Sequence, residues 1–245
     1  MNVLIIIPTY NERENLPLLL QQILDGFPYR VLVVDDQSPD GTGAVADELA
    51  ARFPARLDVM HRTGARGLGL SYLDGFRWAL RTDADLICQM DADLSHDPRY
   101  LPDLVAAAAD HDLVLGSRYL NGISVVNWPL RRIILSSFAN AYVRAITGLT
   151  TRDSTSGYRC WRRRTLAGLD LERFLSHRYA FMVETVFEVA RRGGKVGEVP
   201  IIFIERRQGA SKMSGRVLVE SMIMPWRLVV RNRGRVRHPS GGAAS

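Results

Sequence analysis

The chain has 245 residues, of which 47% are hydrophobic and 24% charged, enough apolar content for one large domain with a core. No apolar run approaches the roughly 18–20 residues that span a bilayer, so the sequence predicts no transmembrane helix. The net charge is +6, but residues 206–245 hold nine Lys or Arg against one Glu, and the rest is slightly acidic. This asymmetry predicts an anionic partner at the C-terminal end and argues against a nucleic-acid face.

The first residues, MNVLIIIPTYNE, lack the basic segment and the small-residue cleavage site of a signal peptide. We expect them to form a strand, and we expect the protein in the cytoplasm. Cys88 and Cys160 are the only cysteines. In that compartment two reduced thiols are expected instead of a disulfide.

Strands and helices are predicted to alternate over the first half of the chain. Unbroken apolar runs indicate strands, and apolar residues three or four apart indicate helices. The predicted strands are 3–8, 29–36, 57–62, 84–93 and 111–119, and the predicted helices are 14–24, 41–53 and 70–80. This alternation is typical of an α/β fold with a mainly parallel sheet covered on both faces.

The pattern changes in the second half of the chain. Residues 130–147 place apolar side chains at helical spacing between arginines, which predicts an amphipathic helix. Residues 215–233 predict a second amphipathic helix, bent or broken near Pro225. Residues 234–245 have the composition of a disordered tail. We therefore expect one domain over 1–214, which includes the first amphipathic helix, followed by the second helix and the tail.

Two aspartates, Asp91 and Asp93, follow the fourth predicted strand and flank a single alanine. At a strand end, alternation points both side chains the same way. Carboxylates this close raise each other's pKa unless a cation lies between them. Mg²⁺ or Mn²⁺, held by one or two carboxylates and by substrate phosphates, fits the arrangement; an exposed acidic turn is the plainer alternative. Polar residues also follow the other strands, and ligands of open α/β sheets bind beyond these carboxyl ends.

Seven segments occur in a fixed order, IIIPTYNE, VVDDQSPDGT, RGLGLSY, MDADLSHDP, GSRY, DSTSGYR and FIERRQGASKMS. From about residue 3 to 214 they resemble the family 2 glycosyltransferases of the GT-A fold. They are most similar to the dolichol-phosphate and polyprenyl-phosphate mannose synthases. Each segment alone is weak, whereas the ordered set is specific. The resemblance implies a Rossmann-like nucleotide-diphospho-sugar transferase with a mainly parallel sheet flanked by helices, plus amphipathic helices at a membrane interface.

The resemblance also implies roles for individual residues. It places Asp91, Ala92 and Asp93 at the metal and the diphosphate. It places Pro8, Tyr10, Glu12, Val34 and Asp36 in the nucleotide pocket, with the Asp36 carboxylate near the base or ribose. The residues implied near the reacting phosphates are Arg118, Arg132 and Ser136, and those implied in a clamp on the donor diphosphate are Arg206 and Lys212.

Two positions depart from the pattern of the relatives. Ser95 stands where some relatives have Gln as a third metal ligand, so either Ser95 itself or a water that it holds is expected there. Glu205 stands where Asp is common. Because Gly and Ser make residues 205–214 pliable, we expect this loop to close over bound donor. The five histidines, His96 among them, show no ligand or triad spacing and are expected in structural or surface roles.

The implied reaction transfers mannose from GDP-mannose to a polyprenyl phosphate with inversion. A divalent ion and cationic side chains would stabilise the leaving diphosphate. The acceptor is already an anion and needs no strong general base, but it needs cations such as Arg118, Arg132 and Arg206 beside it. Three alternatives are a UDP-glucose-dependent transferase acting on the same lipid, a non-catalytic nucleotide-binding partner of a membrane protein, and a nucleotidyltransferase. The intact D-A-D motif opposes the second, and the absence of a Gly-rich first loop opposes the third.

A lipid acceptor implies that the enzyme works at a membrane. We expect it on the cytosolic face, as a peripheral protein docked through residues 130–147 and 215–237. The exposed arginines of the second segment would contact anionic head groups. The expected partners are GDP-mannose, the polyprenyl phosphate and the membrane surface; a separate anchoring protein stays open, and no nucleic acid is expected.

Overall fold

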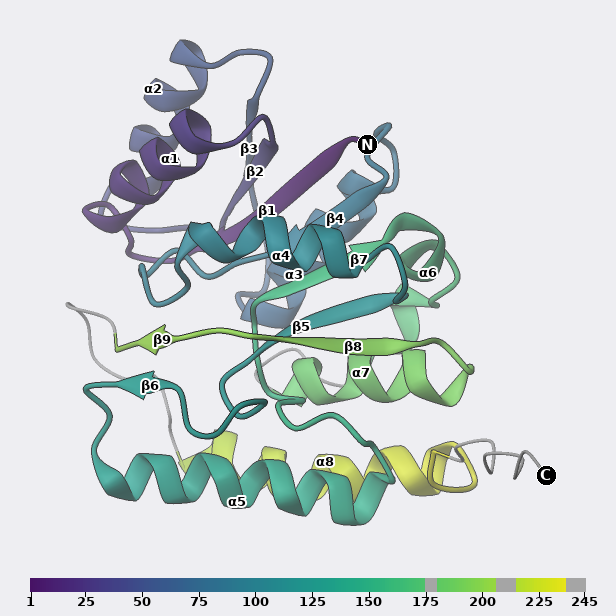
Figure 1. The fold of residues 1–245 in the computed structure, drawn as a ribbon. Coiled ribbons are helices and arrows are strands. Elements are labelled where there is room, and N and C mark those ends of the chain that lie inside the picture. The colour runs from purple at the N-terminus through teal and green to yellow at the C-terminus, as the bar shows by residue number, and fades with distance from the viewer. Residues whose placement is uncertain (175–179, 206–214, 237–245) are drawn as a thin grey trace.

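The computed structural model describes residues 1–174, 180–205 and 215–236, the last range with side chains from residue 221 onward. A seven-stranded sheet runs through the centre in the order β3-β2-β1-β4-β7-β5-β8 (Figure 1). Strand β7 is antiparallel to both of its neighbours, and the other described pairs are parallel. The predicted α/β fold with a mainly parallel sheet is therefore confirmed.

The first half of the chain follows the predicted alternation. Its strands are β1 (Val3–Thr9), β2 (Arg30–Asp35), β3 (Leu57–His61), β4 (Leu86–Gln89) and β5 (Leu113–Ser117). Its helices are α1 (Asn15–Gly26), α2 (Thr42–Arg52), α3 (Leu68–Ala79), the short η1 (Pro98–Tyr100) and α4 (Leu101–Ala107). The unbroken apolar runs explain why these elements were predictable, since the sheet is buried on both faces.

The predicted length of the fourth strand is wrong. β4 ends at Gln89, and Asp91 and Asp93 lie in the loop that follows. The Asp91 N–H donates to His96 Nδ1 at 3.1 Å instead of to a neighbouring strand, and Leu94 takes a positive φ of 61°. Strand alternation therefore does not set the directions of the two carboxylates.

The second half contains smaller strands and longer helices. Its elements are β6 (Val125–Val126), α5 (Leu130–Thr147), β7 (Arg159–Arg162), α6 (Arg163–Ala167), η2 (Leu171–Arg173), α7 (Ala180–Arg191), β8 (Val196–Pro200), β9 (Phe203–Ile204) and α8 (Gly215–Arg231). The predicted helix 130–147 is confirmed as α5. The prediction near Pro225 was a bend or a break, and the break is wrong, because α8 continues through this residue. Met224 and Leu228 anchor this helix in the core, and such packing offsets the hydrogen bond that a proline removes.

Two apolar layers cover the sheet. Helices α1, α2 and α4 pack on one face, where Ile5 and Ile7 of β1 point, and helices α3 and α7 pack on the other, where Leu4 and Ile6 point. Helices α5 and α8 lie side by side beyond α7, as a further layer at the bottom of Figure 1. The parallel strands all end at one edge of the sheet, so the residues that follow them are brought together there.

Candidate active site

The loop after β4 holds Asp91 and Asp93 at the carboxyl edge of the sheet. Tyr72 of α3 donates its hydroxyl to Asp91 Oδ1 at 3.2 Å. Ser95 donates to Asp93 Oδ1 from both its N–H, at 3.1 Å, and its hydroxyl. The Asp91 side chain stays 33% exposed, whereas Asp93 and Ser95 are buried. The hydroxyl groups of Tyr72 and Ser95 therefore orient the two carboxylates.

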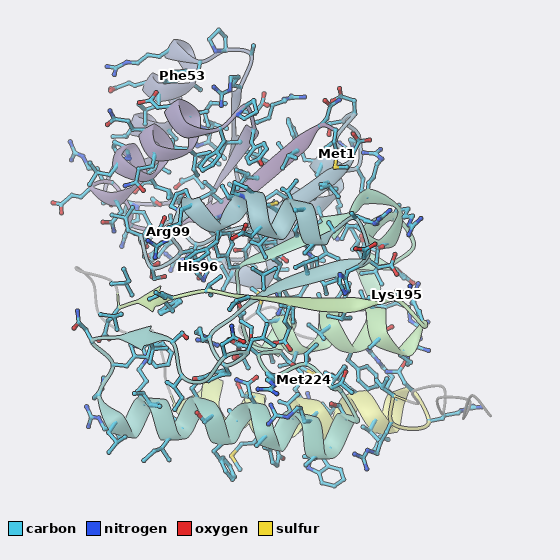
Figure 2. The ribbon with its side chains drawn as sticks, viewed as in Figure 1. Met1, Phe53, His96, Arg99, Lys195 and Met224 are labelled. Atoms are coloured by element: carbon cyan, nitrogen blue, oxygen red, sulfur yellow. The ribbon has the colours of Figure 1, made fainter. Side chains whose placement is uncertain are left out.

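His96 packs against the loop that carries Asp91 and Asp93. Its ring is buried, stacks on Tyr158 and lies edge-on to Phe203 of β9. Figure 2 labels His96 close to β9. Burial lowers the pKa of His96 against the opposing pull of Asp91 and Asp93, so the ring is neutral at pH 7. Its Nδ1 accepts the Asp91 N–H, and the 3.9 Å approach to the Asp91 carboxylate is therefore no ion pair. The expected structural role suits this histidine.

The surroundings of the two carboxylates fit a divalent cation. A Cβ at Gly157 would lie 3.3 Å from Asp91 Oδ2, so glycine leaves the space in which this carboxylate stands. Over residues 1–174, 180–205 and 215–236, no three His, Cys, Asp or Glu side chains gather as a metal site. Asp91 and Asp93 could hold Mg²⁺ or Mn²⁺ as two hard oxygen donors, a number that Mg²⁺ commonly takes from protein when phosphates supply other ligands.

Arg118 lies just after β5 and is held by Asp153. Arg118 Nε and Nη2 donate to the two Asp153 carboxylate oxygens, each at 2.7 Å, and its N–H donates to Oδ2 at 3.0 Å. Asp153 is fully buried. Burial alone would raise the pKa of Asp153, but the Arg118 charge and hydrogen bonds lower it. Arg118 Nη1 has no hydrogen bond to any residue that the structure describes, so one edge of this oriented guanidinium remains for a ligand.

A second buried arginine, Arg159, lies beneath the site. It is 0% exposed, and its guanidinium donates to Ser154 O, Ser156 O and Thr185 Oγ1 at 2.7–3.0 Å. Burial lowers its pKa to about 9, which leaves it charged at neutral pH. The two carbonyls belong to the turn that carries Asp153, so Arg159 fixes the turn on which the Arg118 pair depends.

Arg132, at the start of α5, lies on a more open side of the site. Its Nη1 donates to Glu205 Oε1 at 2.5 Å, and both side chains are 34% exposed. Its guanidinium also lies 4.0 Å from the ring centroid of Trp128. Trp128 packs edge-on against Phe203, which contacts His96 in turn. A row of rings therefore connects Arg132 to the loop of Asp91.

The residues predicted to line a nucleotide pocket lie around the ends of β1 and β2. Asp36 is buried and accepts from Arg62 Nη1 and from the Gly67 N–H, the latter at 2.8 Å. Asp36 therefore fixes the start of α3. Arg66 lies 4.8 Å from the centroid of the Tyr10 ring and donates to its hydroxyl.

The other predicted site residues are spread over the same edge. Pro8 and Val34 are register partners in β1 and β2 and are both buried. Ala92 is buried between the two aspartates, and the Glu12 N–H donates to Thr42 Oγ1 at 2.9 Å. The Ser136 hydroxyl accepts from Tyr119 at 2.7 Å. Arg206, Lys212 and most of the loop 205–214 lie outside the described residues.

The structure adds supporting residues to which sequence reasoning gave no role. They are Tyr72, Trp128, Asp153, Gly157 and Arg159. All except Trp128 lie inside the seven ordered segments, and this position was the one indication in the sequence that they belong to the site. Their pairings join residues far apart in the chain, so no local pattern indicated their roles.

Sequence comparison gives matches along nearly the whole chain. A family model described as Glycosyl transferase family 2 matches residues 4–169. The chain is 48% identical over 242 residues to the polyprenol monophosphomannose synthase of Mycolicibacterium smegmatis, covering 97% of this chain and 90% of that protein. It is 47% identical over 237 residues to the undecaprenyl-phosphate mannosyltransferase of Micrococcus luteus, covering 96% and 97%. A dolichol-phosphate mannosyltransferase of Pyrococcus furiosus is 36% identical over 235 residues, covering 94% and 64%.

Solved structures share the fold at low sequence identity. The glucosyl-3-phosphoglycerate synthase of Mycobacterium tuberculosis, in complex with Mn²⁺, UDP-glucose and phosphoglyceric acid, has a TM-score of 0.68 at 16% identity, covering 98% of this chain and 81% of that chain. The mannosyltransferase PcManGT of Pyrobaculum calidifontis, in complex with GDP-Man and Mn²⁺, has a TM-score of 0.63 at 21% identity, covering 94% and 64%. Together with the family match, these likenesses confirm the predicted GT-A fold.

Proposed function

The chain belongs to glycosyl transferase family 2, and we propose that it transfers mannose from GDP-mannose to a polyprenyl phosphate, giving polyprenyl-phosphate-mannose and GDP. The observation that carries this proposal is the 48% identity, over 97% of the chain, with a polyprenol monophosphomannose synthase. The site supports it with two oriented carboxylates on one side and two arginines, Arg118 and Arg132, on the other.

In the proposed reaction a phosphate oxygen of the acceptor displaces GDP from C1 of mannose in one step, so the configuration at C1 inverts. Mg²⁺ or Mn²⁺ bound by Asp91 and Asp93 would neutralise charge on the leaving diphosphate. The acceptor phosphate is already ionised near neutral pH, so no side chain has to remove a proton from it. His96, which is neutral and buried under the Asp91 loop, is accordingly not needed as a base.

The chain's own residues prepare each substrate. Tyr10, stacked with Arg66, and Asp36, fixed by Arg62, would bind the nucleoside part of the donor. Arg118, oriented by Asp153, would hold the reacting phosphates. Fixed donors of this kind stabilise a developing charge without reorganising when it forms.

We propose that α5 and α8 bring this site to the cytosolic face of a membrane. Both helices leave large apolar side chains exposed, namely Leu130, Ile134, Leu135, Phe138, Met222, Ile223, Trp226 and Val230. We call this set the apolar face. Trp226 Nε1 donates to Tyr142 Oη at 3.0 Å, and Tyr142 donates to Met222 O, so the two helices form one surface. In the described part of the chain, no helix is long and apolar enough to cross a bilayer.

The occupant that fits the apolar face is a bilayer, because exposed Trp and aliphatic side chains there adjoin the exposed arginines Arg227, Arg233 and Arg235. We expect Phe138→Glu with Trp226→Glu to lower flotation with phosphatidylcholine–phosphatidylglycerol vesicles by at least about tenfold. The reason is that two apolar side chains would no longer insert into the bilayer. Leu18→Glu, at an exposed leucine of α1, is the control and should float like the wild type. Equal flotation of all three proteins would disprove docking through this face.

One assay tests the reaction. The protein is incubated with GDP-mannose or UDP-glucose, each with a short polyprenyl phosphate and Mg²⁺. The mass of the lipid product is then measured by mass spectrometry. A hexosyl lipid from GDP-mannose alone supports the proposal. A product from UDP-glucose alone supports the glucosyltransferase alternative, and no product from either donor supports the non-catalytic nucleotide-binding alternative.

A further inference from the structure

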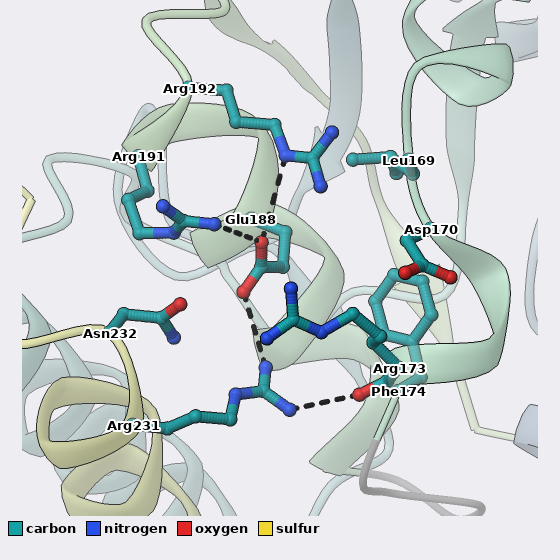
Figure 3. A pocket seen from close by; sticks show the side chains of 9 residues that line it. All are labelled: Leu169, Asp170, Arg173, Phe174, Glu188, Arg191, Arg192, Arg231 and Asn232. Carbon is teal, nitrogen blue, oxygen red and sulfur yellow. Dashed lines mark hydrogen bonds and ion pairs between the residues drawn. The ribbon is translucent and has the colours of Figure 1, made fainter.

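A basic hollow lies at the edge of the sheet opposite the candidate active site. It forms where the ends of α7 and α8 meet η2, and it is open to solvent. Figure 3 shows the side chains of Arg173, Arg191, Arg192 and Arg231 gathered around Glu188. We call these five residues the arginine hollow. Helix α7 ends four residues before β8 begins, so the hollow lies near the amino end of β8 and away from the carboxyl ends of the parallel strands.

The charges around the hollow are unbalanced. Its lining holds four arginines against the carboxylates of Glu188 and Asp170, and buried Glu184 behind it also pairs with Arg231, which leaves a net charge of +1. Glu188 is buried, and its oxygens accept from Arg191 Nη2 at 2.9 Å and from Arg231 Nη2 at 3.2 Å. The Glu188 carboxylate therefore holds these guanidinium groups in place without neutralising the hollow.

Many N–H donors in the hollow remain for a ligand. A guanidinium carries five N–H bonds. Arg191 donates to Glu188, whereas Arg231 donates to Glu188, to Glu184 at 3.0 Å and to the Arg173 carbonyl at 2.9 Å. The Arg173 guanidinium makes no hydrogen bond or ion pair with a residue that the structure describes. Arginines at helix C-termini are also favoured by the helix dipole, which accounts for Arg191 and Arg231. It does not account for Arg173, which comes from η2.

We propose that the arginine hollow binds the phosphate of an anionic phospholipid head group. Clustered guanidinium groups suit phosphate oxygens because they offer paired, charge-assisted hydrogen bonds. A lipid is the indicated source because Arg231 directly follows Val230, which is 76% exposed on the apolar face. Exposed Arg233 and Arg235 continue the positive charge beyond α8. A head group held here would leave its acyl chains beside α8.

Such a contact would set the orientation of the enzyme on the bilayer. The apolar face supplies affinity, and the arginine hollow adds a fixed point at the end of α8 away from the active site. The inference rests on the proposed membrane docking but not on the sugar transfer. Its failure is therefore distinguishable from failure of the proposed reaction.

The test removes charge from the hollow without removing the residues that hold Glu188 most closely. Arg173→Gln with Arg192→Gln is compared with Arg52→Gln with Arg81→Gln, two exposed arginines near the ends of α2 and α3. Flotation uses phosphatidylcholine vesicles with and without phosphatidylglycerol. We expect the first double variant to bind the anionic vesicles about tenfold more weakly and the control to stay within about twofold of the wild type. Equal losses, or no loss, would overturn the proposal.

Two further measurements identify the ligand and the site. Inorganic phosphate is titrated while the Tm is followed. If it stabilises the wild type but not the hollow variant, and leaves vesicle binding unchanged, the hollow binds free phosphate and the lipid assignment fails. Mannosyl transfer to a short acceptor in detergent should be unchanged in the hollow variant. Loss of that transfer with an unchanged circular dichroism spectrum would assign these arginines to the active site and overturn the proposal.

Discussion

Arg118 and Arg132 border the same candidate site, but the protein holds them differently. The Arg118–Asp153 pair is buried, with side chains 10% and 0% exposed, and its contacts are bidentate. The Arg132–Glu205 pair is one-third exposed on both sides and consists of a single contact, from Arg132 Nη1 to Glu205 Oε1. Buried pairs cost much when one partner is lost, whereas exposed pairs exchange their partners for water at little cost. Arg118 is therefore a fixed part of the site, and Arg132 is able to change its partner.

This difference suits a reaction with two anionic substrates. One cation has to stand in a fixed geometry before the substrates arrive, because preorganised charge stabilises a transition state best. In the proposed reaction, another would receive a lipid phosphate from the membrane side, and α5, on which Arg132 lies, carries half of the apolar face. The comparison predicts stability effects at Asp153 and substrate effects at Arg132.

The largest effect is expected from Asp153→Asn. The change leaves Arg118 buried without its carboxylate, so the free energy of unfolding should fall by about 3–5 kcal/mol. Asp58→Asn, which breaks the exposed Arg30–Asp58 pair, is the control and should cost at most about 1 kcal/mol. Urea unfolding measures both variants. A loss at Asp153 no larger than the loss at Asp58 would contradict the contrast between fixed and exchangeable pairs.

The same pair predicts a pH dependence. The pKa of Asp153 is lowered in the folded state, so its contribution to stability is fully present above the unfolded pKa of about 3.9. That contribution is lost as the pH falls through the folded pKa. The wild type should therefore lose more stability than Asp153→Asn on acidification below about pH 4. Parallel pH profiles of the two proteins would argue against this assignment.

The next largest effect is expected on the carboxylate side. Asp93→Asn keeps the size of the side chain but removes its charge. Turnover should fall by at least about a hundredfold, the scale seen when an enzyme loses one group that stabilises charge in the transition state. Nucleoside binding should persist, because Asp36 and its partners are unchanged. Steady-state kinetics with GDP binding as the reference measures this. Turnover near that of the wild type would remove the metal proposal.

A smaller and more selective effect is expected from Arg132→Ala. Loss of a charge-assisted contact should lower kcat/KM for the lipid phosphate by about tenfold or more, with little change in donor binding. Arg132→Lys should restore only part of the loss if the contact is bidentate. Equal losses in the acceptor and donor steps would instead assign Arg132 to the diphosphate or to folding.

The two arginines also show what the sequence was able to predict. The segments GSRY and DSTSGYR indicated that Arg118 belongs to a site, but its partner Asp153 lies 35 residues away and no periodicity joins them. The strand after that turn, β7, was missed because its buried residues include Arg159, which has no place in an apolar pattern. The apolar runs of β1 to β5 carried the fold prediction, whereas pairing between distant polar residues had to come from the structure.

Helix α7 gives the same lesson away from the site. Its residues 180–189 are buried, yet they include Glu184 and Glu188, which break the apolar pattern of a core helix. Both acids pair with Arg231 of α8, 47 and 43 residues away. A buried acid is predictable only when its distant cation is known.

The smallest effect is expected from Glu205→Gln, and it separates two roles for this residue. If Glu205 competes with the acceptor phosphate for Arg132, removing its charge should lower the acceptor KM, by up to about fivefold for an exposed pair worth about 1 kcal/mol. If Glu205 instead positions Arg132, the acceptor KM should rise and Arg132→Ala should mask the change. Glu172→Gln breaks the exposed contact with Arg77, away from the site, and serves as the control. Because exposed pairs add little to stability, the Tm of both variants should stay close to that of the wild type. An acceptor KM unchanged by Glu205→Gln, with Arg132→Ala still defective, would show that Arg132 meets the phosphate without having to leave Glu205.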